Sequence, residues 1–122
     1  MVSTPKRILL VDDSAIIRAS TGAALTRAGF DVTVRAAFDE LLEHGIEGFD
    51  LILMDVQMPE LYGDDVAFTL RGQRGVTTPI YLFSSIDERE LAGLAADAGV
   101  DGYIPKSAGL DALVARVRQI LG

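Results

Sequence analysis

The chain has 122 residues, with 11 lysines and arginines against 18 aspartates and glutamates, so its formal net charge is −7. This length suits one domain spanning residues 1–122 with its own core, and a hydrophobic fraction of 49% argues against intrinsic disorder. The absence of cysteine excludes a disulfide framework, a thiolate zinc site and a cysteine nucleophile. The acidic balance disfavours direct binding to nucleic acid, because phosphate backbones attract basic surfaces.

The sequence contains five short apolar runs, and each predicts a strand buried on both faces; the first is Ile8–Val11. It is too short for a signal-peptide core or a membrane span, so we expect a cytoplasmic protein that does not enter a membrane. A helical pattern follows, and Gly29 stands just past its end, where a left-handed cap is favoured. The apolar stripe of this helix comprises Ile17, Thr21, Ala24, Leu25 and Ala28.

The middle of the chain predicts two more strands, each followed by a helix. The second strand is Val32–Val34 and the third is Leu51–Met54. A helical pattern places Phe38, Leu41 and Leu42 on one face before Gly45. A short helix is expected over about Asp64 to Arg71, bracketed by Gly63 and Gly72.

The C-terminal part predicts the fourth strand over Ile80–Phe83 and the fifth over Gly102–Ile104. The fourth helix lies between them. Its stripe is Leu91, Leu94, Ala95 and Ala98, with acidic residues in its first turn and Gly99 past its end. The stripe of the last helix is Leu110, Leu113, Val114, Val117 and Leu121. Five strands alternating with five helices predict a doubly wound α/β fold with a five-stranded parallel sheet.

Chemistry-bearing side chains follow four of the predicted strands. In open α/β sheets the ligand crevice lies beyond the carboxyl ends of the strands. Asp12, Asp13, Asp55, Ser84 and Lys106 all stand at such ends. We therefore expect three carboxylates, a hydroxyl and an ammonium group to converge.

Several of these residues also have structural interpretations. Asp13 and Ser14 are both candidates for the cap of the first helix, and Ser85 and Asp87 for that of the fourth. Asp55 is less easily explained in this way, because a carboxylate directly after an apolar strand is costly to desolvate without a partner.

Carboxylates that crowd together repel one another, and a divalent cation with oxygen ligands relieves that repulsion. Mg²⁺ is the cation we expect, since it takes one or two carboxylates and leaves a position for a phosphoryl oxygen. In that setting Lys106 neutralises charge on a transferring phosphoryl group, Ser84 donates a hydrogen bond to it, and Asp55 is the nucleophile. The alternative for Lys106 is a solvated lysine in a loop.

Four segments carry a family resemblance: Leu10–Asp13, Leu53–Pro59 with Gly63, Ser84, and Tyr103–Lys106. Each alone is a weak signal. In this order and spacing, the chain resembles the receiver domains of two-component response regulators, and is similar to the single-domain chemotaxis type, over essentially its whole length. The resemblance implies the flavodoxin-like receiver fold and a phosphorylation-controlled signalling switch.

The resemblance also implies a role for each site residue. Asp55 is implied to accept a phosphoryl group from a histidine kinase or a small phosphodonor. Asp13, Asp55 and the backbone carbonyl of Gln57 are implied to hold Mg²⁺ directly, and Asp12 to orient a metal-bound water. Lys106 is implied to form an ion pair with Asp55 or its phosphate.

For output, the resemblance implies that Ser84 moves toward the phosphoryl group and that Tyr103 turns inward with it. This alters the face made by the fourth helix, the fifth strand and the fifth helix, which binds a downstream protein partner or a second copy of the chain. The alternative for Tyr103 is a half-buried edge aromatic with its hydroxyl in water.

Two departures from the family pattern stand out. Ser107 follows Lys106 where the family often has a proline joined by a cis bond, so we expect a trans bond or a locally strained loop here. Ser84 replaces the commoner threonine, which keeps the hydroxyl but loosens the side chain.

Other functions are weighed against the switch. The main alternative is a receiver-like interaction module that works without phosphate. Such a module is expected to have lost some of the five site residues, and all five are present here. A phosphohydrolase with an aspartyl nucleophile needs a second acid where Gln57 stands. A flavodoxin-like FMN carrier is also disfavoured, because Asp12 and Asp13 would repel the phosphate of the flavin. We therefore expect no enzymatic activity other than self-catalysed phosphoryl transfer and autodephosphorylation. The chain is expected to be either a stand-alone protein or the receiver part of a longer regulator.

Overall fold

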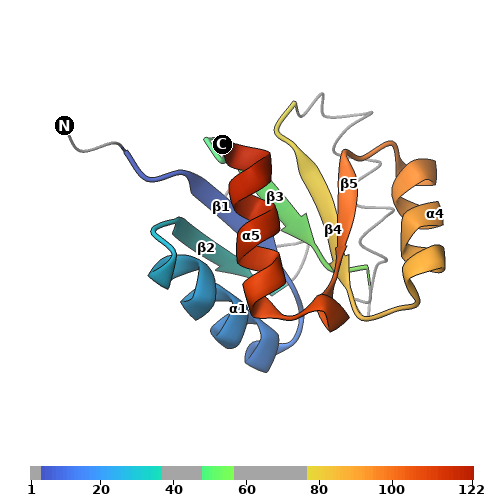
Figure 1. Ribbon diagram of the computed structural model, residues 1–122, viewed down its shortest axis with the longest axis horizontal. Helices are drawn as coiled ribbons and strands as arrows, with labels where there is room; N and C mark the ends of the chain where they lie inside the picture. Colours follow the sequence, from blue (N-terminus) through green and yellow to red (C-terminus); the bar gives the residue numbers. More distant parts are fainter. Residues whose placement is uncertain (1–3, 37–47, 57–76) are drawn as a thin grey trace.

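We describe a computed structural model of the protein over residues 4–36, 48–56 and 77–122 (Figure 1). The helical patterns predicted around Phe38–Gly45 and Asp64–Arg71 lie outside the described residues. Gln57, whose carbonyl is an implied metal ligand, also lies outside them. Within the described ranges, every helix is too short or too polar to span a bilayer.

A five-stranded parallel sheet forms the centre of the fold. Its strands are β1 (Arg7–Val11), β2 (Asp31–Arg35), β3 (Leu51–Met54), β4 (Ile80–Ser84) and β5 (Gly102–Pro105). Their order in the sheet is β2-β1-β3-β4-β5, and every neighbouring pair is parallel. The order reverses at β1, so the crevice of a doubly wound sheet is expected beside the ends of β1 and β3.

Helices cover both faces of the sheet, as predicted. The helices are α1 (Ala15–Arg27), α4 (Glu88–Ala98) and α5 (Leu110–Leu121), and a 3₁₀ helix, η1 (Lys106–Ala108), links β5 to α5. One core cluster joins the sheet to Leu25 of α1 and Leu113 of α5, and the other joins it to Leu91 of α4. Figure 1 shows α1 and α5 side by side, with α4 apart from them.

The central strands β1, β3 and β4 are buried on both faces, as their continuous apolar runs predict. The same prediction is wrong for the two edge strands: Val34 of β2 is 38% exposed, and Tyr103 of β5 is only half-buried. Because these strands lie at the edges of the sheet, only part of their surface meets another element. Leu110, predicted on the buried stripe of α5, is also 38% exposed because it opens the helix beside η1.

The helix ends resolve the two capping alternatives. Ser14 caps α1, because its side chain accepts a hydrogen bond from the amide of Ile17. Asp87 caps α4 by accepting from the amides of Arg89 and Glu90. Gly99 follows α4 in the left-handed conformation, with φ of 71°. Asp13 therefore does not cap α1 and is left at the carboxyl end of β1 for another role.

Gly102 is predicted to be essential for packing β5 against β4. A Cβ atom at this position would lie 2.7 Å from Cε2 of Tyr81, which is buried beneath α5. We expect Gly102→Ala to lower the free energy of unfolding by about 1–3 kcal/mol, the usual cost of overpacking.

The matched control is Gly93→Ala, since nothing lies within 4 Å of a Cβ at this exposed position in α4. It is expected to raise stability by about 0.5–1 kcal/mol through its higher helix propensity. Urea denaturation measures both variants, and a Gly102→Ala protein as stable as the wild type would contradict the packing argument.

Candidate functional site

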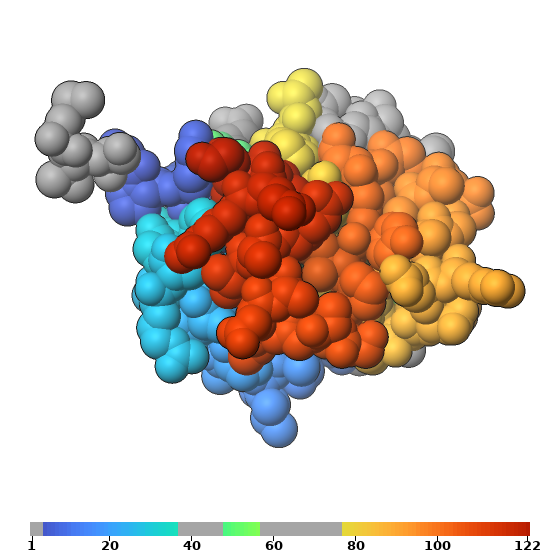
Figure 2. Space-filling model, in the orientation of Figure 1, coloured from blue at the N-terminus to red at the C-terminus, as the bar shows by residue number. Residues whose placement is uncertain are grey.

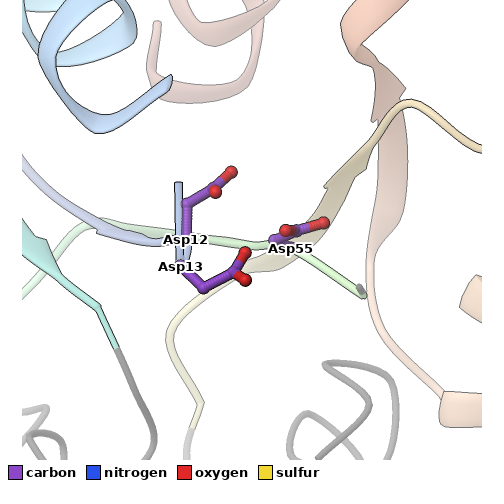
Figure 3. A group of neighbouring side chains, drawn as sticks. All are labelled: Asp12, Asp13 and Asp55. Carbon is purple, nitrogen blue, oxygen red and sulfur yellow. The ribbon is translucent and has the colours of Figure 1, made fainter. Parts of the chain in front are cut away.

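The carboxyl ends of β1 and β3 bring three aspartates together. Asp12 and Asp13 follow β1 directly, and Asp55 follows β3. One carboxylate oxygen from each of them lies within 4.8 Å of the other two. Figure 3 shows the side chains of Asp12 and Asp13 diverging from adjacent backbone positions, with Asp55 across from both.

Asp12 is fully buried and bonded through all four of its polar atoms. Its Oδ1 accepts from the amide of Ser14 at 2.9 Å, and its Oδ2 accepts from Nζ of Lys106 at 2.7 Å. Its amide donates to the carbonyl of Arg35 at 3.0 Å, and its own carbonyl accepts from Nη1 of Arg18 at 2.7 Å. These contacts hold Asp12 in one orientation at the base of the site.

Lys106 reaches the aspartates from the carboxyl end of the edge strand β5. Its Nζ lies 3.7 Å from Oδ2 of Asp55, so the nearest carboxylate is that of Asp12 and not that of Asp55. The ammonium group also lies 5.3 Å from the centre of the Phe83 ring. Lys106 thus contacts both buried carboxylates, and the alternative of a solvated loop lysine is wrong.

The loop after Lys106 has regular geometry. The described residues contain no cis peptide bond, so the Lys106–Ser107 bond is trans, as expected without a following proline. Gly109, with φ of 93°, turns the chain from η1 into α5. A substitution at Gly109 would be strained, because side chains rarely adopt this conformation.

Asp55 and Ser84 are both buried at neighbouring strand ends. Asp55 is 3% exposed, and its amide donates to the carbonyl of Val11 at 2.9 Å, which fixes the end of β3 against β1. Ser84 is fully buried, and its Oγ accepts from the amide of Ile86 at 3.3 Å. The sequence prediction that both residues stand where strands end is confirmed.

A pocket of about 450 Å³ opens over these groups. It is lined by Asp12, Asp13, Ser14, Ile17, Asp55, Ser85, Lys106 and Ser107. Among the lining aspartates, Asp13 is the exposed one, whereas Asp12 and Asp55 are buried. Three carboxylates that supply oxygen atoms at this separation form a donor set that suits Mg²⁺, which prefers oxygen ligands and keeps several waters.

Mg²⁺ is expected to stabilise this protein, because a ligand that binds only the folded state raises its melting temperature. Asp13→Asn removes one of three neighbouring negative charges. We therefore expect this variant to melt at a higher temperature than the wild type when a chelator is present, and to gain less from added Mg²⁺.

Thermal unfolding with chelator and with Mg²⁺ measures both effects. Asp87→Asn is the control for a charge change outside the site, because asparagine caps a helix as well as aspartate. A wild type whose melting temperature does not change with Mg²⁺ would contradict the metal site. An Asp13→Asn protein that melts at a lower temperature than the wild type in chelator would show that repulsion among the carboxylates does not govern the stability of this site.

Tyr103 lies away from the acidic pocket, at a shallow groove of about 390 Å³ between α4 and α5. Its side chain is half-buried, and its hydroxyl donates to Oε1 of Glu88 at 3.4 Å. Arg116 lines the opposite side of this groove. Figure 2 shows the residues of β5 reaching the surface between α5 and α4. Tyr103 is therefore half-buried on the edge strand, as the alternative predicts, but its hydroxyl is hydrogen-bonded to Glu88.

The structure adds one contact that the sequence motifs do not single out. Arg18, one turn beyond the cap of α1, donates to the backbone of Asp12. The only signal in the sequence is its spacing of four residues from Ser14, which places both on one side of the helix.

Comparisons with known proteins point to one family. Residues 8–118 match the response regulator receiver domain. The chain is 39% identical over 126 residues to the response regulator MprA of Mycobacterium tuberculosis, an alignment that covers 94% of this chain and 50% of MprA. The chain spans about half the length of the curated relatives it matches.

Solved structures agree with this match. The chemotaxis response regulator CheY4 of Vibrio cholerae superposes with a TM-score of 0.84 at 28% identity, covering 97% of this chain and 100% of that chain. A CheY-like receiver domain protein from Methanospirillum hungatei gives a TM-score of 0.81 at 26% identity, covering 97% of this chain and 94% of that chain. The arrangement of strands and helices is shared with both.

Proposed function

Because this chain belongs to the response regulator receiver domain family, we propose that it is a switch in which Asp55 accepts a phosphoryl group. The observation that carries the proposal is the meeting of Asp12, Asp13 and Asp55 within 4.8 Å, with the ammonium of Lys106 3.7 Å from Asp55. Receiver domains of two-component systems share this chemistry, and Asp12, Asp13, Asp55, Ser84 and Lys106 supply the side chains that it uses.

The chemical step is a phosphoryl transfer onto a carboxylate oxygen of Asp55. The phosphorus bond to the donor's histidine nitrogen or acyl oxygen breaks, and the new acyl phosphate bond forms on Asp55. Lys106 neutralises charge on the phosphoryl oxygens as it transfers, and Ser84 donates a hydrogen bond to one of them. Water later hydrolyses the acyl phosphate, which returns the carboxylate.

Receiver domains generally bind Mg²⁺ at an acidic pocket, and the donor set here fits that ion. We assign Asp13, Asp55 and the backbone carbonyl of Gln57 as direct ligands, with Asp12 holding a coordinated water. When bound, Mg²⁺ supplies charge neutralisation on the phosphoryl oxygens. The chain's own part is to hold the carboxylates in place and to keep Lys106 between Asp12 and Asp55.

Response regulators interact with histidine kinases and with downstream effectors. For this chain we assign output to the groove between α4 and α5. Phosphorylation draws Ser84 toward Asp55, and the space vacated beside β4 lets Tyr103 leave Glu88 and turn inward. The groove lined by Tyr103 and Arg116 then presents a different surface to a protein partner.

The coupling between site and groove can be measured by amide NMR spectra before and after phosphorylation with an acyl phosphate and Mg²⁺. The amides of Tyr103 and Ala112, which line the groove, are expected to shift. In Ser84→Ala, phosphoryl uptake is expected to continue while these shifts shrink. Equal groove shifts in the wild type and in Ser84→Ala would contradict the role of Ser84 in the switch.

The setting of the domain is also part of the proposal. The domain acts either alone or as the receiver part of a longer regulator, in the cytoplasm, and without turnover of an external substrate. A homodimer through the face made by α4, β5 and α5 is a further arrangement for output. Sedimentation at several protein concentrations, with and without phosphorylation, separates a dimer from a monomer that binds another protein.

A further inference from the structure

Arg18 ties helix α1 to the strand end that carries two of the three aspartates. Its guanidinium donates from Nη1 to the carbonyl of Asp12 at 2.7 Å, in a partly buried setting. Asp12 is fully buried, whereas Asp13, the next residue, is exposed in the pocket. Arg18 therefore contacts the acidic site through backbone and not through a carboxylate.

The carbonyl that Arg18 holds belongs to the peptide group between Asp12 and Asp13. A peptide group is planar, so fixing the carbonyl of Asp12 also fixes the direction of the amide of Asp13. The other hydrogen bonds of Asp12 are made by its side chain and by its own amide, which lie outside this peptide group. Among the described residues, Arg18 is thus the side chain that holds the peptide group leading into Asp13.

We propose that Arg18 is a positioning residue for the cation site, orienting the Asp12–Asp13 peptide so that the carboxylate of Asp13 faces Asp55. The proposal rests on the proposed function, since it assigns Arg18 to the same Mg²⁺ site. Groups that orient metal ligands commonly change metal affinity by about 10–100-fold when they are removed.

The sign of the effect separates positioning from simple electrostatics. A guanidinium beside a divalent cation repels it, so charge alone predicts that removing Arg18 strengthens Mg²⁺ binding. Positioning predicts weaker binding, because the carboxylate of Asp13 then samples orientations that do not face Asp55. The two explanations therefore predict opposite changes in the same measurement.

The experiment compares Arg18→Met and Arg18→Lys with the wild type. Methionine keeps an unbranched apolar stem and removes the donor, whereas lysine keeps a charge and a donor without the planar fork. Arg27→Met is the matched control, because Arg27 lies on the same helix, about 13 Å farther along its axis. Mg²⁺ affinity is measured by amide NMR titration of the intact chain.

We expect Arg18→Met to weaken Mg²⁺ binding about 10-fold, Arg18→Lys to recover part of the loss, and Arg27→Met to match the wild type. Without metal, the NMR resonance of the Asp13 amide is expected to change its chemical shift in Arg18→Met and to keep the wild-type chemical shift in Arg27→Met. Thermal unfolding of each variant identifies any general loss of structure.

Two results would overturn the proposal while the proposed function stands. One is an Arg18→Met protein that binds Mg²⁺ as tightly as a binding-competent wild type, or more tightly. The other is an Asp13 amide whose chemical shift in the metal-free Arg18→Met protein equals that of the wild type. A wild type that binds no Mg²⁺ would instead overturn the metal site itself and the role of Arg18 with it.

Discussion

Replacing Asp55 with asparagine is expected to abolish phosphoryl uptake from an acyl phosphate in the presence of Mg²⁺. Asp55 supplies the attacking oxygen, and an amide oxygen is too weak a nucleophile to replace it. The variant should remain folded, because the buried position keeps a side chain of the same size and loses one of three neighbouring negative charges. Intact mass spectrometry after incubation with the donor measures the incorporation.

The control for this substitution is Asp87→Asn, which changes a capping aspartate into an equally good cap outside the pocket. It is expected to accept a phosphoryl group as the wild type does. Full incorporation into Asp55→Asn would mean that another residue is the acceptor, and the assignment of Asp55 would then be abandoned.

Lys106→Met is expected to produce the second large effect, on both stability and rate. The side chain of Lys106 is 14% exposed and pairs with Asp12, whose side chain has no exposure. Breaking a buried pair by removing one partner costs about 3–5 kcal/mol, because a buried charge is left without compensation. Urea denaturation in chelator should show a loss of this order, and Mg²⁺ should restore part of it.

The same variant is expected to take up phosphoryl groups about 100-fold more slowly, the usual cost of losing one group that stabilises developing charge. Lys6→Met is the matched control, since Lys6 is the chain's other lysine and is exposed.

A double variant tests the source of the instability. Adding Asp12→Asn to Lys106→Met removes the buried carboxylate charge that has lost its partner. The asparagine keeps an oxygen that can accept a hydrogen bond from the amide of Ser14. We expect the double variant to recover most of the lost stability, which is a non-additive result for residues in direct contact. Additive losses in the cycle would show that Lys106 stabilises the fold by some route other than its pair with Asp12.

The central part of the fold could be predicted from the sequence because its signals are local. Continuous apolar runs mark β1, β3 and β4, and Gly29 and Gly99 mark the ends of α1 and α4 with positive φ values of 100° and 71°. The prediction of full burial was wrong for the edge strands β2 and β5. Whether a strand lies at the edge of a sheet depends on strand order, and no local pattern in these strands encodes that order.

The candidate site could be predicted in composition but not in its pairing. The sequence places Asp12, Asp55 and Lys106 at strand ends, and topology then brings strand ends to one edge of the sheet. It cannot say which carboxylate the ammonium meets first. In the structure Nζ of Lys106 lies 2.7 Å from Oδ2 of Asp12 and 3.7 Å from Oδ2 of Asp55. Which carboxylate is nearer depends on the path of the chain from β5 into η1, and the sequence does not specify that path.

Contacts to backbone atoms are the part that sequence reasoning misses most readily. Arg18 reaches a carbonyl, and any residue offers a carbonyl, so no pair of residue types marks the contact. Capping was ambiguous for a related reason, since Asp13 and Ser14 are both good caps and only the path of the chain decides between them.

The most direct test of the switch is the intact mass of the wild-type chain after incubation with a small acyl phosphate, once with Mg²⁺ and once with a chelator. We predict the gain of one phosphoryl group with Mg²⁺ and little or none with the chelator. No gain under either condition would contradict the proposed function and favour a receiver-like module that binds its partners without phosphate.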